Sequence, residues 1–446
     1  MLRTQPQSRR ALYILLCIFL SAFLIRLFIA VSYENFFDTS IYMDWARGLQ
    51  DGFFNAYARA GELNLDYPPL WLYPLYLVGA FLQTPAVSEY VPYTMLSIKF
   101  FPILFDCMTI VLLYLFANKK LKSPQKALIV AGIWSVNPSA IYNSACWGQT
   151  DTVLVFLILL TLWFFDEDMP VAGCICYGIA ALSKMQALYF APVILFLVLA
   201  SRHLPTILKS IGAGLATVLA GFLPFILGSG NVLLPFTVYF GGMGRYPHIN
   251  LNAANFYGLF PALNWVEDDA SILGGLPNAE GVRVGGFTFG TLSVILLILS
   301  LLFVFYFTFI KGKGKKHVPF FSALLMIQCV FMLTTRQHER YQFALTGISL
   351  ALYVLSELNN RYLLLYGGIT LTTFLNQYIL LSKVHSPDAP WLSHYDALLS
   401  LISLINIFFF FWSVYLAIRY FRDQNPQKAE SVPPLPSEPA VPASSV

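Results

Sequence analysis

The amino-acid sequence predicts an all-α polytopic membrane protein, and its composition, its long apolar runs and its charge distribution support this fold class. Of 446 residues, 57% are hydrophobic and only 11% are charged, whereas a typical soluble domain carries about 25% charged residues. Apolar runs of roughly 20 residues, enough for a helix to cross a hydrocarbon core about 30 Å thick, recur along the chain. Helices are the expected spanning form because backbone polar groups must be satisfied within lipid.

The apolar runs predict about twelve transmembrane helices. The first is too long for a cleavable signal, and no small-residue cleavage site follows it. A shorter apolar stretch at 67–82 contains Pro68, Pro69 and Pro74, and we expect it to form a helix at the membrane surface. The predicted spans lie near residues 11–31, 93–117, 126–145, 150–166, 171–187, 188–201, 206–227, 285–310, 317–335, 341–357, 361–381 and 396–419.

Lysine and arginine residues set the predicted orientation. With the N- and C-termini in the cytosol, most of them fall on inside loops, including the clusters at 119–126 and 311–316. Excess Lys and Arg marks the cytoplasmic side. Counting 67–82 as a span would place the first cluster outside, so the charge bias rejects that alternative. We therefore expect a multi-pass protein of the cell membrane with long external loops at 32–92 and 228–284.

The sequence also predicts the domain organisation of the chain and the kind of partner that it binds. Residues 1–421 are predicted to form one transmembrane domain, and the Pro- and Ser-rich residues 422–446 a disordered cytosolic tail. The net charge of +4 reflects anchoring at the inner face of the bilayer, so the lipid bilayer is an expected partner and nucleic acid is not.

Polar motifs that are far apart in the sequence all fall on the predicted outer side. The first external loop is acidic and ends in Asp66-Tyr67-Pro68-Pro69. The third span ends at Asn137-Pro138 and leads into NSACWGQTD, and the ninth span ends in TRQHERY. A membrane scaffold needs no such clustering of carboxylate, imidazole and guanidinium groups. The candidate site residues are Asp38, Asp44, Asp66, Trp147, Gln149, Asp151, Lys184, Gln186, Arg336, His338, Glu339 and Arg340, with Arg245, His248, Asn250 and Asn255 on the second long loop.

Each motif also has a purely structural interpretation. Asp38 and Asp44 can be solvated loop acids, Asp66 can fix a turn before two prolines, and TRQHERY can be a basic collar at a helix end. Trp147 and Gln149 can be interfacial anchors. These alternatives stay open for each motif taken alone.

Two further pairs of residues are candidates for separate sites. Asp106 lies in the middle of a predicted span, two turns from Lys99, and we expect a structural buried Asp–Lys pair there. His338 and Glu339 are adjacent potential metal ligands without a supporting motif. No cofactor is therefore expected, and a divalent metal completed by a first-loop carboxylate is a minor alternative.

Four motifs together resemble membrane-embedded glycosyltransferases of the GT-C superfamily. FDTSIYMDWARGL followed by LDYPPLWLYPLY is similar to the first lumenal loop of the enzymes that use dolichyl-phosphate-glucose. Asp38 and Trp45 have the family's spacing, and Leu65 to Pro69 match its Leu-Asp-Tyr-Pro-Pro block. NPSAIYNSACWGQTDTV, ALSKMQALYFAPVI and TRQHERYQFAL follow in the family's order, so the resemblance covers about residues 30 to 350.

This sequence departs from the family pattern in the last motif. Arg336 and Arg340 stand where the family's His-x-His-Glu-Lys motif has its first His and its Lys, and Arg and Lys bind phosphate differently. The chain is also shorter than the eukaryotic enzymes. The resemblance therefore implies a bacterial relative that takes a hexose from a polyprenyl-phosphate-linked sugar and delivers it to a glycan or glycolipid acceptor on the outer face.

The resemblance also implies roles for individual residues. Asp38 would be the general base, which must lie within hydrogen-bond reach of the acceptor hydroxyl. Arg336, His338, Arg340 and Lys184 would bind the lipid phosphate. Asp66 and Glu339 would orient them. A single carboxylate opposite the leaving group implies inversion, by analogy with glycosidases.

Two other classes of protein remain as alternatives. A lipid-linked-glycan flippase or secondary transporter would also have about twelve spans, but its polar groups are expected near the bilayer midplane and in related halves of the chain. A non-catalytic accessory subunit of the same fold would retain the helices without the chemistry. The donor sugar, the acceptor, the linkage and the polyprenol type do not follow from the sequence.

Overall fold

Helices account for most of the computed structural model, which describes residues 6–34, 37–244, 246–278, 281–386, 388 and 390–424. The predicted all-α polytopic membrane fold is confirmed. Arg245 and the greater part of the predicted tail, residues 425–446, lie outside the described residues. Helices coincide with the predicted spans as α1 (Pro6–Ser32), α6 (Val91–Leu121), α7 (Pro124–Ser135), α9 (Asp151–Asp166), α10 (Pro170–Ser183), α11 (Ala191–Ala200), α12 (Leu204–Ser229), α14 (Phe289–Tyr306), α15 (Val318–Leu333), α16 (Ala344–Leu355), α17 (Asn360–His385) and α18 (Tyr395–Asp423).

Helix length divides this set into two groups. In the described part of the chain, six helices are long and apolar enough to cross a membrane, namely α1, α6, α12, α14 with its π-helical extension η8 (Phe307–Lys311), α17 and α18. Several others, such as α10 and α16, are apolar but shorter. Because a full crossing takes about 20 residues, the figure of about twelve crossings stays a prediction.

The third predicted span is not one continuous helix. α7 ends at Ser135, and Asn137 caps the short helix α8 (Pro138–Ile141) by accepting a hydrogen bond from the Ala140 amide at 3.1 Å. Pro138 explains the break, since proline starts a helix well but cannot continue one. A π-helical turn, η4 (Tyr142–Trp147), follows and ends at Gly148 with φ +79°. The helix thus ends close to Asn137-Pro138, as predicted, whereas a single helix over the whole of 126–145 was wrong.

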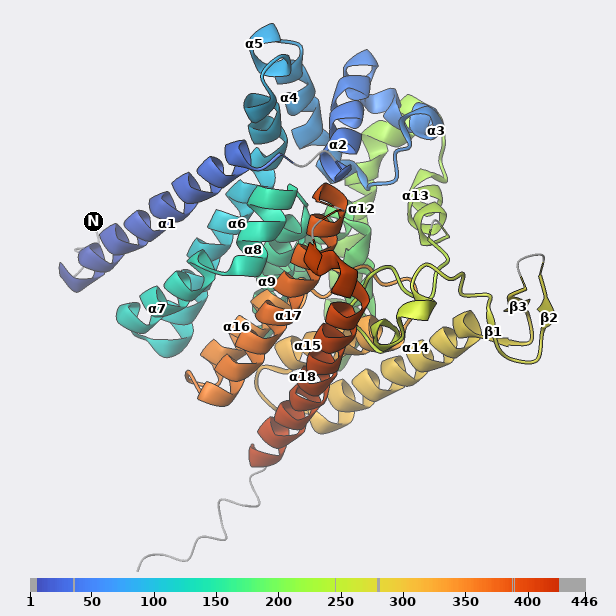
Figure 1. Cartoon of the computed structure of the whole chain (residues 1–446). Helices are drawn as coiled ribbons and strands as arrows, with labels where there is room; N and C mark the ends of the chain where they lie inside the picture. Colours follow the sequence, from blue (N-terminus) through green and yellow to red (C-terminus); the bar gives the residue numbers. More distant parts are fainter. Residues whose placement is uncertain are drawn as a thin grey trace, which may run out of the picture.

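The first external loop folds into a helical layer over one end of the bundle, at the top of Figure 1. Its members are α2 (Phe37–Gly48), η1 (Leu49–Asp51), η2 (Phe53–Arg59), α3 (Ala60–Leu63), η3 (Pro69–Trp71), α4 (Leu72–Leu82) and α5 (Pro85–Ser88). Trp45 is buried and its indole nitrogen donates to the Leu63 carbonyl oxygen at 2.8 Å. α4 packs on α2, where Gly79 lies against the Ala46 carbonyl. This layer holds α2 in place.

The second external segment contains elements that the sequence analysis did not predict. It comprises α13 (Leu234–Met243), η6 (Tyr257–Leu259), η7 (Pro261–Leu263) and four short strands, seen at the right of Figure 1. The strands pair antiparallel in two sheets, β1 (Ser271–Leu273) with β4 (Phe287–Thr288) and β2 (Leu276–Pro277) with β3 (Arg283–Val284). A further 3-10 turn, η9 (Pro390–His394), leads into α18, and another, η5 (Met185–Phe190), joins α10 to α11.

Contacts between helix ends divide the bundle into two ends as the predicted topology requires. At one end Lys120 and His317 both bond to Asp166, at 2.5 and 2.9 Å, so three of the predicted inside loops meet there. The outer-rim motifs meet at the opposite end. These three loops thus lie at one end, as the predicted topology requires, whereas the complete alternation and the side of the membrane that each end faces remain predictions.

The predicted pairing of Asp106 with Lys99 is wrong. Both side chains are fully buried, but Asp106 pairs with Arg26 of α1 at 2.7 Å. Lys99 instead donates to the carbonyl oxygens of Tyr33 at 2.6 Å and Ala30 at 3.4 Å, at the end of α1. A lysine can satisfy the last carbonyls of a helix in this way. Arg26 was missed because its distance from Asp106 in the sequence gives no sign that they are neighbours.

Candidate active site

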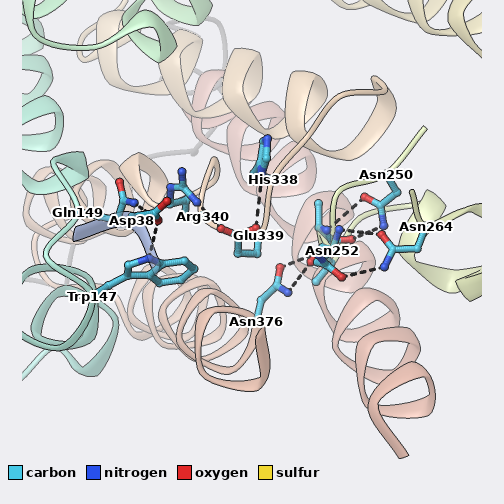
Figure 2. Close-up of polar contacts among 12 residues, drawn as sticks. Asp38, Trp147, Gln149, Asn250, Asn252, Asn264, His338, Glu339, Arg340 and Asn376 are labelled. Atoms are coloured by element: carbon cyan, nitrogen blue, oxygen red, sulfur yellow. Dashed lines mark hydrogen bonds and ion pairs between the residues drawn. The ribbon is translucent and has the colours of Figure 1, made fainter. Parts of the chain in front are cut away.

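Asp38 lies in the first turn of α2 and is held by two side chains, those of Trp147 at the end of η4 and Gln149 just after it. The Trp147 indole nitrogen donates to Asp38 Oδ2 at 2.7 Å, and the Gln149 amide nitrogen donates to the same oxygen (Figure 2). Among the described residues, Asp38 Oδ1 accepts no hydrogen bond. The half-buried carboxylate is therefore fixed in orientation through one oxygen while the other is left for a further partner.

Aromatic residues of α2 and of the turn before η3 complete this support. Tyr42 lies one turn after Asp38 on α2, and its hydroxyl donates to the Gln149 amide oxygen at 3.3 Å. The same hydroxyl lies 3.0 Å from that of Tyr67, in the Asp66-Tyr67-Pro68-Pro69 block. The first external loop and the third span thus meet around Gln149. Tyr42 was missed, although its i, i+4 spacing from Asp38 places both on one face of a helix.

Arg340 extends the site towards the TRQHERY loop. Its guanidinium lies over the Trp147 ring, 5.3 Å from the ring centroid, in a cation–π arrangement. Arg340 Nη1 donates to Glu339 Oε1 at 2.5 Å, and Nε lies 3.8 Å from Asp151 Oδ2. Trp147 therefore contacts both the Asp38 carboxylate and the Arg340 guanidinium.

Asp151 connects Arg340 to the fifth span. Its carboxylate accepts hydrogen bonds from Lys184 Nζ at 2.5 Å and from the Asn143 amide at 3.0 Å. Lys184 is about 1% exposed, so its positive charge is neutralised in place. Gln186 lines a small pocket together with Asp151, Arg340 and Tyr341. Asp151, Lys184, Gln186 and Arg340 come from separate sequence motifs, and the structure brings them together.

Burial and charge act in opposite directions on the Glu339–Arg340 pair. Burial disfavours the ionised form of Glu339, but Arg340 and then His338 outweigh it and hold the pKa of Glu339 below its ordinary value. Burial likewise opposes the charge on Arg340, while Glu339, Asp38 and Asp151 together raise its pKa well above the ordinary value. Both groups are therefore ionised at neutral pH.

His338 lies beside this pair and is half-buried. Its Nδ1 atom is 3.7 Å from Glu339 Oε2, and its ring packs edge-on to Tyr246 and tilted against Tyr341, with centroids 5.2 and 4.9 Å apart. The imidazole is thus held between two tyrosine rings. Figure 2 shows His338 beside Glu339 and Arg340.

The remaining predicted residues are placed differently. Arg336 adopts φ +64° and pairs with Asp268 through two hydrogen bonds of 2.7 and 3.2 Å, so its guanidinium is directed to the second external segment. Asp44 is exposed on α2, and Asp66 is half-buried before η3. Lys184, Arg336 and Arg340 each have a carboxylate partner.

Among the described residues, no group of three or more His, Cys, Asp or Glu side chains is arranged to hold a metal ion. His338 and Glu339 remain a pair of potential ligands, and the need for a metal stays an open prediction.

Comparison with known proteins gives the same superfamily as the motifs. Residues 87–227 match the family described as dolichyl-phosphate-mannose-protein mannosyltransferase. GPI mannosyltransferase 1 of Kluyveromyces lactis is 28% identical over 174 residues, 37% of this chain and 41% of that protein. GPI mannosyltransferase 1 of Saccharomyces cerevisiae is 30% identical over 125 residues, 27% of this chain and 30% of that protein.

The chain thus spans less than half the length of these curated relatives. The predicted resemblance to GT-C superfamily membrane glycosyltransferases is confirmed by these matches. The relatives are named as mannosyltransferases, whereas the sequence motifs were compared with glucosyltransferases.

Proposed function

We propose that this protein is an integral-membrane glycosyltransferase that moves a hexose from a polyprenyl-phosphate-linked sugar to an acceptor hydroxyl at the outer face of the membrane, with inversion. The observation that carries the proposal is the Asp38 carboxylate, oriented by Trp147 and Gln149 beside the Arg340 guanidinium. Trp147 contacts both a base, Asp38, and a cation, Arg340. A base and a cation placed so close together suit transfer of a sugar from a phosphate leaving group.

Asp38 acts as the general base in this mechanism. Its free oxygen accepts the proton of the acceptor hydroxyl while the hydroxyl oxygen attacks the anomeric carbon of the donor. The bond between that carbon and the phosphate oxygen breaks, and polyprenyl phosphate leaves with the electron pair. One displacement without a covalent intermediate inverts the anomeric centre, by analogy with glycosidases.

Arg340 and His338 stabilise the charge that builds on the departing phosphate. Both side chains are only 14% exposed, and electrostatic interactions are stronger in such surroundings than in water. Glu339 and Asp151 compensate the Arg340 and Lys184 charges when no donor is bound. They therefore keep the cations in place instead of adding to phosphate affinity.

The names of the relatives suggest the first donor to test. Both are mannosyltransferases, so a polyprenyl-phosphate-linked mannose is the leading candidate. The acceptor class is a lipid-linked or surface glycan with a free hydroxyl.

The deciding experiment supplies purified protein in nanodiscs with labelled polyprenyl-phosphate-mannose or labelled nucleotide-mannose, together with a panel of glycolipid acceptors. We expect transfer from the lipid-linked donor only. Efficient transfer from the nucleotide sugar alone would contradict the proposal. Movement of lipid-linked sugar across sealed vesicles without a new glycosidic bond would favour the flippase alternative, and neither activity would favour an accessory role.

Asp38→Asn tests the proposed base in the same assay. Loss of a general base reduces rate by about 10²- to 10⁴-fold, and we expect a loss of this size with an unchanged thermal unfolding midpoint. Asp51→Asn is the matched control, because Asp51 lies in the same external layer with a side chain 76% exposed. Wild-type turnover by Asp38→Asn would remove Asp38 from this role.

A further inference from the structure

The loop that carries His338 is attached to the second external segment through its backbone. The Leu251 amide donates to the Gln337 carbonyl oxygen at 3.1 Å. Leu251 and Asn252 each form an isolated β-bridge with His338. The position of the His338 main chain therefore depends on where residues 251 and 252 are held.

Asn252 is held on its side chain and on both of its backbone groups. Its amide donates to Asn264 Oδ1 at 2.8 Å, while Asn264 Nδ2 and the Tyr395 hydroxyl donate to Asn252 Oδ1 at 2.8 and 2.9 Å. Its φ of +59° is left-handed, a conformation that asparagine tolerates better than most residues. Asn252 is 4% exposed, so these bonds face no competition from bulk water.

Asn376 fixes this residue to the transmembrane bundle. From α17 its Nδ2 atom donates to the Asn252 carbonyl oxygen, and its Oδ1 atom accepts from the Ala254 amide, both at 2.8 Å (Figure 2). One fully buried side-chain amide thus satisfies two backbone groups of the external segment. Buried backbone groups are costly to leave unpaired, so the segment and α17 are held together.

We propose that Asn376, acting through Asn252, is a positioning residue for His338. The amide clamp holds residues 252–254 against α17, the bridges at 251–252 hold the His338 main chain, and the ring is thereby kept between Tyr246 and Tyr341 beside Glu339. This inference rests on the proposed function, in which His338 addresses the donor phosphate. The inference extends the proposed site to Asn376, a buried residue of α17 that itself contacts no substrate.

The first test measures transfer kinetics for Asn376→Ala and for Gln377→Leu. Gln377 is the adjacent residue on α17 and is equally buried, and neither atom of its amide has a hydrogen-bond partner within the described residues. We expect Asn376→Ala to raise the donor KM by about 2- to 12-fold, the range that one net hydrogen bond supplies, with a smaller change in kcat. Gln377→Leu should behave as the wild type.

A double-mutant cycle separates positioning from general stability. If Asn376 acts through His338, Asn376→Ala should have no further effect on the donor KM in a His338→Ala background, because interacting sites are not additive. Fully additive effects would overturn the inference. So would equal losses in Asn376→Ala and Gln377→Leu, since these would reflect damage to α17 alone.

A chemical readout tests the inference without requiring transfer activity. The rate at which diethyl pyrocarbonate modifies His338, followed by peptide mass spectrometry, reports how well the ring is held. We expect a higher rate in Asn376→Ala and a wild-type rate in Gln377→Leu. An unchanged rate would overturn the positioning role. If the wild type transfers no sugar while this rate still rises, the proposed function fails and the structural coupling stands.

Discussion

Arg26 and Asp106 form a fully buried ion pair that connects the first span to the candidate site. Arg26 Nη1 also donates to the Ser135 carbonyl oxygen at 3.0 Å, where α7 ends. Asp106 in turn accepts hydrogen bonds from Trp134 at 3.0 Å and Ser144 at 2.8 Å. Ser144 lies in η4, three residues before Trp147. Arg26 and Asp106 thus stabilise the break between α7 and η4. The residues that follow this break, Trp147 and Gln149, hold Asp38.

We predict that Arg26→Leu strongly destabilises the protein. Removing one partner leaves a buried carboxylate uncompensated, which costs about 3–5 kcal/mol, whereas replacing both partners with apolar residues costs much less. The thermal unfolding midpoint in detergent should therefore fall clearly for Arg26→Leu and recover in part for Arg26→Leu/Asp106→Leu. Arg419→Leu, which removes the exposed pair with Asp423, is the control and should change little. A double variant as unstable as the single one would contradict this account.

At the scale of elements, the contact between α2 and α4 sets where Asp38 lies. A methyl group at Gly79 on α4 would overlap the Ala46 carbonyl of α2 and the Gln50 side chain. Glycine is thus required there for close packing of the two helices. Trp45 of α2 and Leu49 at the start of η1 are also buried, so packing on α2 resists a shift of this helix.

Gly79→Ala should therefore weaken both packing and catalysis. Overpacking of this kind costs about 1–3 kcal/mol, and the shift of α2 moves Asp38 relative to Trp147. We expect a lower unfolding midpoint together with reduced transfer at saturating substrate. Gly61→Ala is the control, because a methyl group there meets no heavy atom within 4 Å. If both variants behave as the wild type, the α2–α4 contact does not set the position of Asp38.

At the scale of the whole molecule, the two ends of the bundle differ in chemistry. Lys119, Lys120 and His317, which follows the 311–316 loop, gather at one end with Asp166 and Glu167. The Asp38, Asp151 and Glu339 carboxylates lie at the other. Excess Lys and Arg marks the cytosolic side, so the candidate site should face outside.

Labelling of single cysteines tests this orientation in intact cells. We expect an impermeant maleimide to label Asp51→Cys, and to label Lys313→Cys only after permeabilisation. The background carries Cys17→Ser and Cys146→Ala, so that the probe is the accessible thiol. Labelling of Lys313→Cys but not Asp51→Cys in intact cells would invert the topology and separate the site from an external substrate.

The sequence by itself determined the helical membrane architecture. The length of an apolar run and the Lys and Arg content of a loop are local properties of the sequence, and the bilayer constrains both directly. It also identified most of the side chains that meet around Asp38, since polar motifs at one rim stand out against apolar spans. The end of the third span near Asn137-Pro138 was predicted, because proline cannot continue a helix, but the π-helical turn η4 that follows was not.

Only the tertiary structure decided which charged groups pair. Arg26 rather than Lys99 neutralises Asp106, Arg336 turns to Asp268, and Lys184 is neutralised by Asp151. The asparagine clamp at Asn252 and Asn376 also depends on residues more than a hundred positions apart. The physical reason is that pairing energies depend on distance and burial in three dimensions, and spacing along the chain carries neither for residues on different helices.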